Sequence, residues 1–162
     1  MDQHKIKVGI THGDINGIGY EVIIKAMADS RMLEMCTPIV YGSPKVAAYH
    51  RKALDVELFS FNQINTAREA NSKRVNIINC VDEEIRVELG KSTQVAGEAA
   101  LLSLQAAMKD LKSGDIDVVV TAPINKENIQ SEQFHFPGHT EYFAAEFDAK
   151  NYMMLMVSDN LR

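Results

Sequence analysis

The sequence lacks the features that mark several common classes of protein. Its 162 residues include two cysteines, Cys36 and Cys80, which form no C-x-x-C pair, so no thiolate metal site or redox motif is indicated. No stretch approaches the roughly 18 consecutive apolar residues that a transmembrane helix needs. Lys and Arg form no cluster and the formal net charge is -5, which argues against a dedicated nucleic-acid binder. We therefore expect no nucleic-acid partner and no membrane span.

What is present is an ordinary globular composition, with 46% hydrophobic and 24% charged residues. A chain of this length is one domain or a piece of one. Residues 1–5 run directly into an apolar segment without the hydrophobic core of a signal peptide. We therefore expect a cytoplasmic protein.

Short apolar runs alternate with segments of helical period, a pattern typical of βαβ units and a mostly parallel sheet. The pattern predicts strands over residues 6–10, 39–41, 56–61, 75–79, 116–120 and 152–157. It predicts helices over residues 19–27, 44–52, 95–111 and 141–147. The run 116–120 is nearly all apolar and rich in β-branched residues, which is typical of the buried centre of a parallel sheet.

A glycine-rich segment, residues 11–19, follows the first predicted strand. Ligands of open α/β sheets bind beyond the carboxyl ends of strands, and glycines there let backbone N–H groups approach an anion. The segment is neither standard nucleotide motif, because Ile18 stands where a Walker motif needs glycine and Val22 replaces the third Rossmann glycine. A tight turn that needs small residues explains the glycines equally well.

Two further segments carry candidate binding residues. The stretch 121–126 leaves an apolar strand with Asn125 and Lys126, and a lysine at that edge can hold a phosphate, although it can also be simply solvated. After a Pro-Gly turn, His139 and Thr140 place an imidazole beside a hydroxyl, which suits proton exchange and hydrogen bonding to a polar substrate. Alternatively, Thr140 is a helix N-cap with His139 packed beside it.

The five histidines show no spacing typical of metal ligands, so we expect no metal site built from this chain alone. Three segments, taken in order, nevertheless resemble one family. Residues 8–19 resemble its T-x-G-[DE]-x-x-G-I-G signature, residues 119–126 its T-[AG]-P-[IV]-x-K strand end, and residues 136–143 its F-x-G-H-T-E-[FY]-[FL] motif. The family is the 4-hydroxythreonine-4-phosphate dehydrogenases, with phospho-threonate and phospho-erythronate dehydrogenases as close kin.

This resemblance implies NAD-dependent oxidation and decarboxylation of 4-phosphohydroxy-L-threonine in vitamin B6 (pyridoxal phosphate) biosynthesis. It also implies a three-layer α/β/α fold like that of isocitrate and isopropylmalate dehydrogenases. Family members are homodimers and hold a divalent metal (zinc, magnesium or cobalt) with three histidines. Those histidines lie beyond residue 162, so we expect residues 1–162 to be an N-terminal portion that is inactive alone.

The resemblance also carries individual residues over to this chain. His139 and Thr140 match the family's substrate-binding pair. The positions that match segments lining the same cleft are Asp14, Gly17, Gly19, Asn125 and Lys126.

Four positions in and directly after the glycine-rich segment depart from the family pattern. His12, Ile15, Asn16 and Tyr20 stand where members commonly have proline, proline, alanine and proline. A loop with fewer prolines is expected to be less rigid, and the choice of substrate within the family stays open. Two other hypotheses remain: a non-catalytic domain that binds a phosphometabolite or a partner, and a phosphate acyltransferase, against which the His-Thr pair argues.

Overall fold

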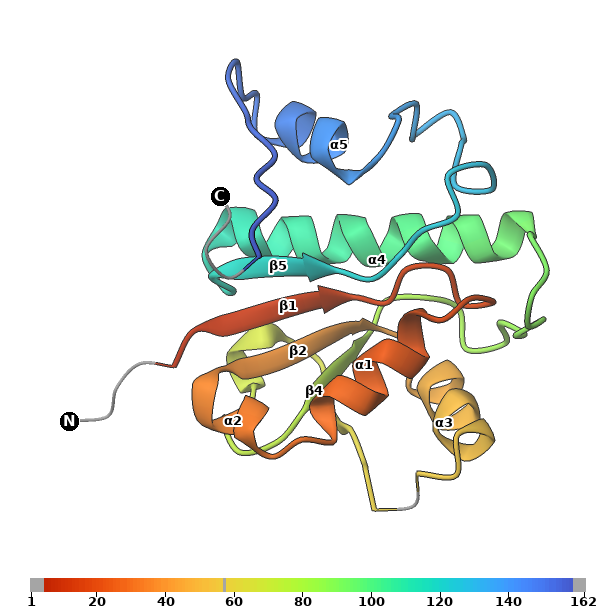
Figure 1. The fold of residues 1–162 in the computed structure, drawn as a ribbon, viewed down its shortest axis with the longest axis vertical. Coiled ribbons are helices and arrows are strands. Elements are labelled where there is room, and N and C mark those ends of the chain that lie inside the picture. Colours follow the sequence, from red (N-terminus) through yellow and green to blue (C-terminus); the bar gives the residue numbers. More distant parts are fainter. Residues whose placement is uncertain (1–4, 57, 159–162) are drawn as a thin grey trace. The chain divides into compact units, whose positions relative to one another are not determined.

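The computed structural model describes residues 5–56 and 58–158, which divide after Ile129 into two compact units. The first unit is built on a five-stranded parallel sheet of order β3-β4-β2-β1-β5 (Figure 1). The strands are β1 (Lys7–Thr11), β2 (Thr37–Gly42), β3 (Asn62–Ile64), β4 (Asn76–Asn79) and β5 (Val118–Thr121). The expected parallel α/β architecture is confirmed.

Helices cover both faces of this sheet (Figure 1). The helical elements of the first unit are α1 (Gly19–Met27), α2 (Arg31–Met35), α3 (Pro44–Ala53), the 3-10 turn η1 (Ala67–Glu69) and α4 (Gln94–Ser113). Side chains alternate along a strand. Val40 of β2 accordingly packs in one apolar cluster with residues of α1 and α3, whereas its neighbours Ile39 and Tyr41 pack in a second cluster with Ala107 of α4. The fold is therefore the expected three-layer α/β/α arrangement.

Local signals fix the ends of the helices. Ser43 caps α3 by accepting a hydrogen bond from the Val46 N–H at 3.2 Å, with Pro44 at the first helical position. Thr93 caps α4 in the same way, and Gly114 ends that helix in the left-handed conformation with φ +76°. None of the helices in the described ranges is long and apolar enough to cross a bilayer.

Two of the predicted strands are wrong. In the stretch 56–61, of which residue 57 lies outside the described residues, Phe59 turns into the core with its ring 4.8 Å from that of Phe61, and β3 follows only at Asn62. Residues 152–157 form no strand and are exposed. A strand needs a neighbour for its backbone hydrogen bonds, and the described part of the second unit contains no strand to provide one.

β5 differs from a further expectation, because it lies at the edge of the five-stranded sheet and pairs only with β1 among the residues that the structure describes. Val118 and Val120 are 42% and 52% exposed, so β5 is not the buried central strand that its composition predicts.

Candidate functional site

The carboxyl ends of β1 and β5 meet where the order of the sheet reverses. The chain continues from β1 to β2 on one side, whereas β5 adds to β1 on the other. Thr11 and Thr121 are partners in the register, so residues 12–18 (the glycine loop) and residues 122–129 (the β5 loop) leave neighbouring strand ends. Ligands of open α/β sheets bind at such a switch point. Both loops belong to the first unit.

Hydrogen bonds join the two loops. The Ala122 N–H donates to the Thr11 carbonyl at 3.0 Å, and the Asp14 N–H donates to the Pro123 carbonyl at 2.9 Å. The Asn128 amide donates to the Asp14 carboxylate at 3.4 Å. The structure thus brings Asp14 next to the segment that carries the other predicted residues of the β5 loop. Asn128 was not singled out from sequence, since no motif position marks it.

The glycines of the loop have different roles. Gly13 has φ +69°, and a Cβ at Gly13 would overlap the Pro123 carbonyl. A Cβ at Gly19 would overlap the His12 carbonyl, so both glycines are needed for close packing of the backbone. A Cβ at Gly17 would instead lie in ordinary contact with Asp14, and Gly17 is exposed. Of these three, Gly17 is the glycine that leaves the backbone open to a ligand.

The start of α1 adds to this opening. Its N-cap residue, Ile18, has an apolar side chain that makes no capping hydrogen bond. The side chain at this position therefore provides no acceptor for the N–H groups of the first turn. Such groups favour an anion.

Asn125 and Lys126 are neighbours with different surroundings. The Asn125 side chain accepts hydrogen bonds from the N–H groups of Glu127 and Asn128 at 2.9 and 3.2 Å, and donates to the Ser92 hydroxyl at 3.3 Å. It therefore shapes the β5 loop. Lys126 is exposed and brings a positive charge to this edge of the sheet.

Asn16 links the glycine loop to residues 88–93. Its side chain donates to the Lys91 carbonyl at 3.0 Å and the Thr93 hydroxyl at 3.1 Å, and accepts from the Glu88 N–H at 2.7 Å. In the sequence, Asn16 stands out only as a departure from the family pattern. These hydrogen bonds restrain the loop where prolines are missing. They therefore counteract the loss of rigidity that the missing prolines predict.

Three aromatic rings stack behind the glycine loop. The Tyr20 ring lies between those of His12 and His50, at centroid distances of 5.3 and 5.2 Å. Burial lowers the pKa of His12 to about 4, although backbone groups of Gly13 and Ala99 partly oppose the shift. Burial also lowers the pKa of His50. Both imidazoles are therefore neutral near pH 7, and the stack supports the loop rather than carrying charge.

His139 and Thr140 lie in the second unit, at the start of α5 (His139–Glu146). Gly138 is the N-cap residue of α5, so Thr140 is not the cap and that alternative is wrong. The His139 ring stacks on Phe143 at 6.2 Å, and both candidate residues are half-buried. A cleft shared by these residues and the glycine loop of the first unit stays a prediction.

The described residues include no group of three or more His, Cys, Asp or Glu side chains placed to hold a metal ion. The described part of this chain therefore does not fit the implied metal by itself.

Comparisons with known proteins agree on one family. A family model described as pyridoxal phosphate biosynthetic protein PdxA matches residues 34–162. The chain is 56% identical to 4-hydroxythreonine-4-phosphate dehydrogenase of Bacteroides thetaiotaomicron, over 98% of this chain and 44% of the relative. It is 33% identical to D-threonate 4-phosphate dehydrogenase of Cupriavidus necator, over 100% of this chain and 49% of the relative.

Solved structures give the same result. A crystal structure of a 4-hydroxythreonine-4-phosphate dehydrogenase from Burkholderia phymatum matches with a TM-score of 0.82 and 29% identity, over 92% of this chain and 46% of that one. The chain thus spans about half the length of the relatives it matches.

Proposed function

This chain belongs to the PdxA family of pyridoxal phosphate biosynthetic proteins, and we propose that it is the N-terminal part of an NAD-dependent 4-hydroxythreonine-4-phosphate dehydrogenase. The observation that carries the proposal is the meeting of the glycine loop and the β5 loop at the switch point, in a chain 56% identical to an enzyme of that name. D-threonate 4-phosphate is the alternative substrate, since a relative named for it is 33% identical.

The residues that line the proposed cleft divide into two groups. Gly17 and Lys126 accommodate negative charge, Gly17 through its open backbone at the start of α1 and Lys126 through its ammonium group. Asp14, Gly19 and Asn125 hold the shape of the cleft, because each is engaged in packing or bonding within the loops.

His139 and Thr140 bind the substrate in this proposal. The Thr140 hydroxyl is not used as a helix cap, so it can hydrogen-bond a hydroxyl or carboxylate of the substrate. The His139 imidazole, held against Phe143, orients the hydroxyl that is oxidised. NAD, when bound, accepts the hydride, while the protein supplies orientation.

The family resemblance extends the proposal to the whole enzyme. We infer a cytoplasmic homodimer that uses zinc, magnesium or cobalt held by residues outside this chain. With under half of the relative's length, the 162-residue chain alone is expected to be inactive.

A chimera tests the function. Residues 1–162 replace the matching part of the Bacteroides thetaiotaomicron relative, a substitution that 56% identity makes tolerable. NAD reduction with 4-phosphohydroxy-L-threonine is measured for the chimera and for the chain alone. The proposal predicts turnover by the chimera only. A folded chimera that binds this substrate without oxidising it would favour a non-catalytic binding domain.

The site assignment has its own test in the same chimera. His139→Ala is expected to lower kcat/KM about a hundredfold or more, the scale of loss typical of a group that positions or protonates a reacting substrate. The matched control is His135→Ala, which removes an exposed imidazole four residues away. Equal values of kcat/KM for the two variants would show that His139 is not part of the site.

A further inference from the structure

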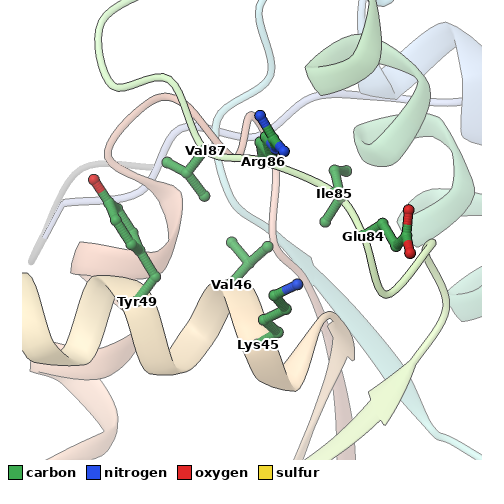
Figure 2. A pocket seen from close by; sticks show the side chains of 7 residues that line it. All are labelled: Lys45, Val46, Tyr49, Glu84, Ile85, Arg86 and Val87. Carbon is green, nitrogen blue, oxygen red and sulfur yellow. The ribbon is translucent and has the colours of Figure 1, made fainter.

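A hollow of about 620 Å³ lies between α3 and the loop that follows β4. This α3 pocket is lined by Lys45, Val46 and Tyr49 from the helix and by residues 84–87 from the loop (Figure 2). None of these residues belongs to the glycine loop or the β5 loop. Its volume is in the range of small-molecule sites.

Apolar and aromatic side chains form part of the lining of the α3 pocket. Val46 is buried, Ile85 and Val87 are half-buried, and the Tyr49 ring stands at the side of the space (Figure 2). In the figure, Val46 on the helix faces Ile85 and Val87 on the loop. Aliphatic walls beside an aromatic face suit a planar ring, which can stack on Tyr49.

Charge at the rim favours an anion. The charged residues that line the α3 pocket are Lys45, Arg86 and Glu84, so this lining has one net positive charge on a chain whose formal charge is -5, while Glu83 lines the neighbouring hollow. The Lys45 ammonium donates to the Glu83 carbonyl at 3.0 Å, which holds it at the pocket. Arg86 makes no ion pair with any residue that the structure describes. Guanidinium and ammonium groups both bind phosphate oxygens, and here one comes from the helix and the other from the loop.

A second hollow of about 360 Å³ shares Lys45 and Glu84 with the α3 pocket. Asn79 lines it, and the Asn79 side-chain oxygen is buried without a hydrogen-bond partner among the described residues. Buried acceptors are normally satisfied. A hydroxyl or N–H group of a ligand that extends from the first hollow into the second would satisfy this one.

We propose that the α3 pocket binds a planar aromatic ring that carries a phosphate group. The ring packs between Tyr49 and Val46, and the phosphate binds to Lys45 and Arg86. Pyridoxal phosphate and an adenine nucleotide share this chemistry. The inference that the ligand combines a planar ring with a phosphate group rests on the pocket alone. The inference that this ligand is a vitamin B6 phosphate rests on the proposed function.

Calorimetric titration of the 162-residue chain distinguishes the two sources. The probes are pyridoxine 5′-phosphate, which has no aldehyde to react with lysines, and adenosine monophosphate, with no NAD or substrate present. We expect saturable one-to-one binding of one probe. Arg86→Gln should weaken it about tenfold, as expected for loss of a charge-assisted hydrogen bond. Lys73→Gln, which removes an exposed cation outside the pocket, should leave binding unchanged.

Further readouts keep the proposal falsifiable. Tyr49→Leu should weaken binding of the ring-bearing probe but not binding of ribose 5-phosphate. The NMR chemical-shift changes of backbone amides on binding should centre on residues 45–49 and 84–87. Failure of both probes to saturate would overturn the proposal, as would equal binding by Arg86→Gln and Lys73→Gln, or shifts confined to other residues. Circular dichroism verifies that each variant is folded. Activity of the chimera is independent of these outcomes, so the two proposals can fail separately.

Discussion

At the scale of single residues, the loop positions that depart from the family pattern are fixed by their own contacts. Tyr20 stacks between two imidazoles, and its hydroxyl accepts a hydrogen bond from the Ser43 N–H at 2.8 Å. Asn16 reaches the Glu88 backbone, 72 residues away in sequence. The sequence shows that these residues are unusual, but it does not show such distant partners. Their stabilising role could therefore not be predicted.

The buried imidazole of His12 predicts a dependence of stability on pH. Its pKa is about 4 in the folded protein and 6.5 in the unfolded chain, so only the unfolded chain gains a proton between those values. The free energy of unfolding should therefore fall as the pH drops through this window, by about 2 kcal/mol between about pH 7 and pH 5. Urea unfolding at several pH values measures this change in the free energy of unfolding.

His12→Phe is the informative variant for this prediction, because it keeps an aromatic ring beside Tyr20 and cannot titrate. It should lose most of the pH dependence over that window. The control, His135→Gln, removes an exposed imidazole and should retain it. An unchanged slope in His12→Phe would show that His12 is not the group responsible.

Asn16 provides a second test at this scale. Asn16→Ala removes three hydrogen bonds and leaves the Glu88 N–H and the Lys91 carbonyl without this partner. We expect a loss of about 2 to 3 kcal/mol in the free energy of unfolding. Hydrogen exchange should also quicken at the Glu88 amide. An exchange rate of the Glu88 amide in Asn16→Ala equal to that of the wild type would contradict the claim that Asn16 holds the loop.

At the scale of elements, the periodic patterns predicted α1, α3, α4, α5 and four of the five strands of the sheet, but neither α2 nor η1. In the structure, α3 begins at the Ser43 cap with Pro44, and α4 ends at Gly114. Prediction failed where tertiary neighbours decide the structure. Phe59 fills the core instead of joining a strand. The apolar run predicted as a strand over 116–120 contributes residues 118–120 to β5, but the edge position of β5 depends on which other strands are present.

A pair of glycine substitutions tests the construction of the glycine loop. Gly13→Ala introduces a Cβ at φ +69° that meets the Pro123 carbonyl, so it should cost about 2 kcal/mol or more. Gly17→Ala meets only ordinary contacts and should change stability by less than about 1 kcal/mol. Thermal unfolding of both variants measures the difference. Equal losses would mean that Gly13 does not pack as described.

The edge position of β5 predicts tolerance to a polar residue. Val120 is 52% exposed, so Val120→Thr should change the free energy of unfolding of this chain by no more than about 0.5 kcal/mol. Ile10 of β1 is buried, and Ile10→Thr should cost about 2 kcal/mol or more. Similar costs in urea unfolding would show that β5 is covered in solution.

At the scale of the whole molecule, we propose that the glycine loop and the β5 loop form part of a substrate site that also uses His139 and Thr140. The sequence placed both loops at strand ends, and the parallel pairing of β1 with β5 explains why they meet. The contribution of the second unit, which contains His139 and Thr140, rests on the family resemblance.

Hydrogen exchange of the chimera, measured by mass spectrometry with and without 4-phosphohydroxy-L-threonine, tests this claim most directly. The account predicts that the substrate slows exchange in three segments together: residues 12–18, residues 122–129 and the start of α5 at residues 138–141. Slower exchange at the start of α5, with both loops of the first unit unchanged at saturating substrate, would contradict it.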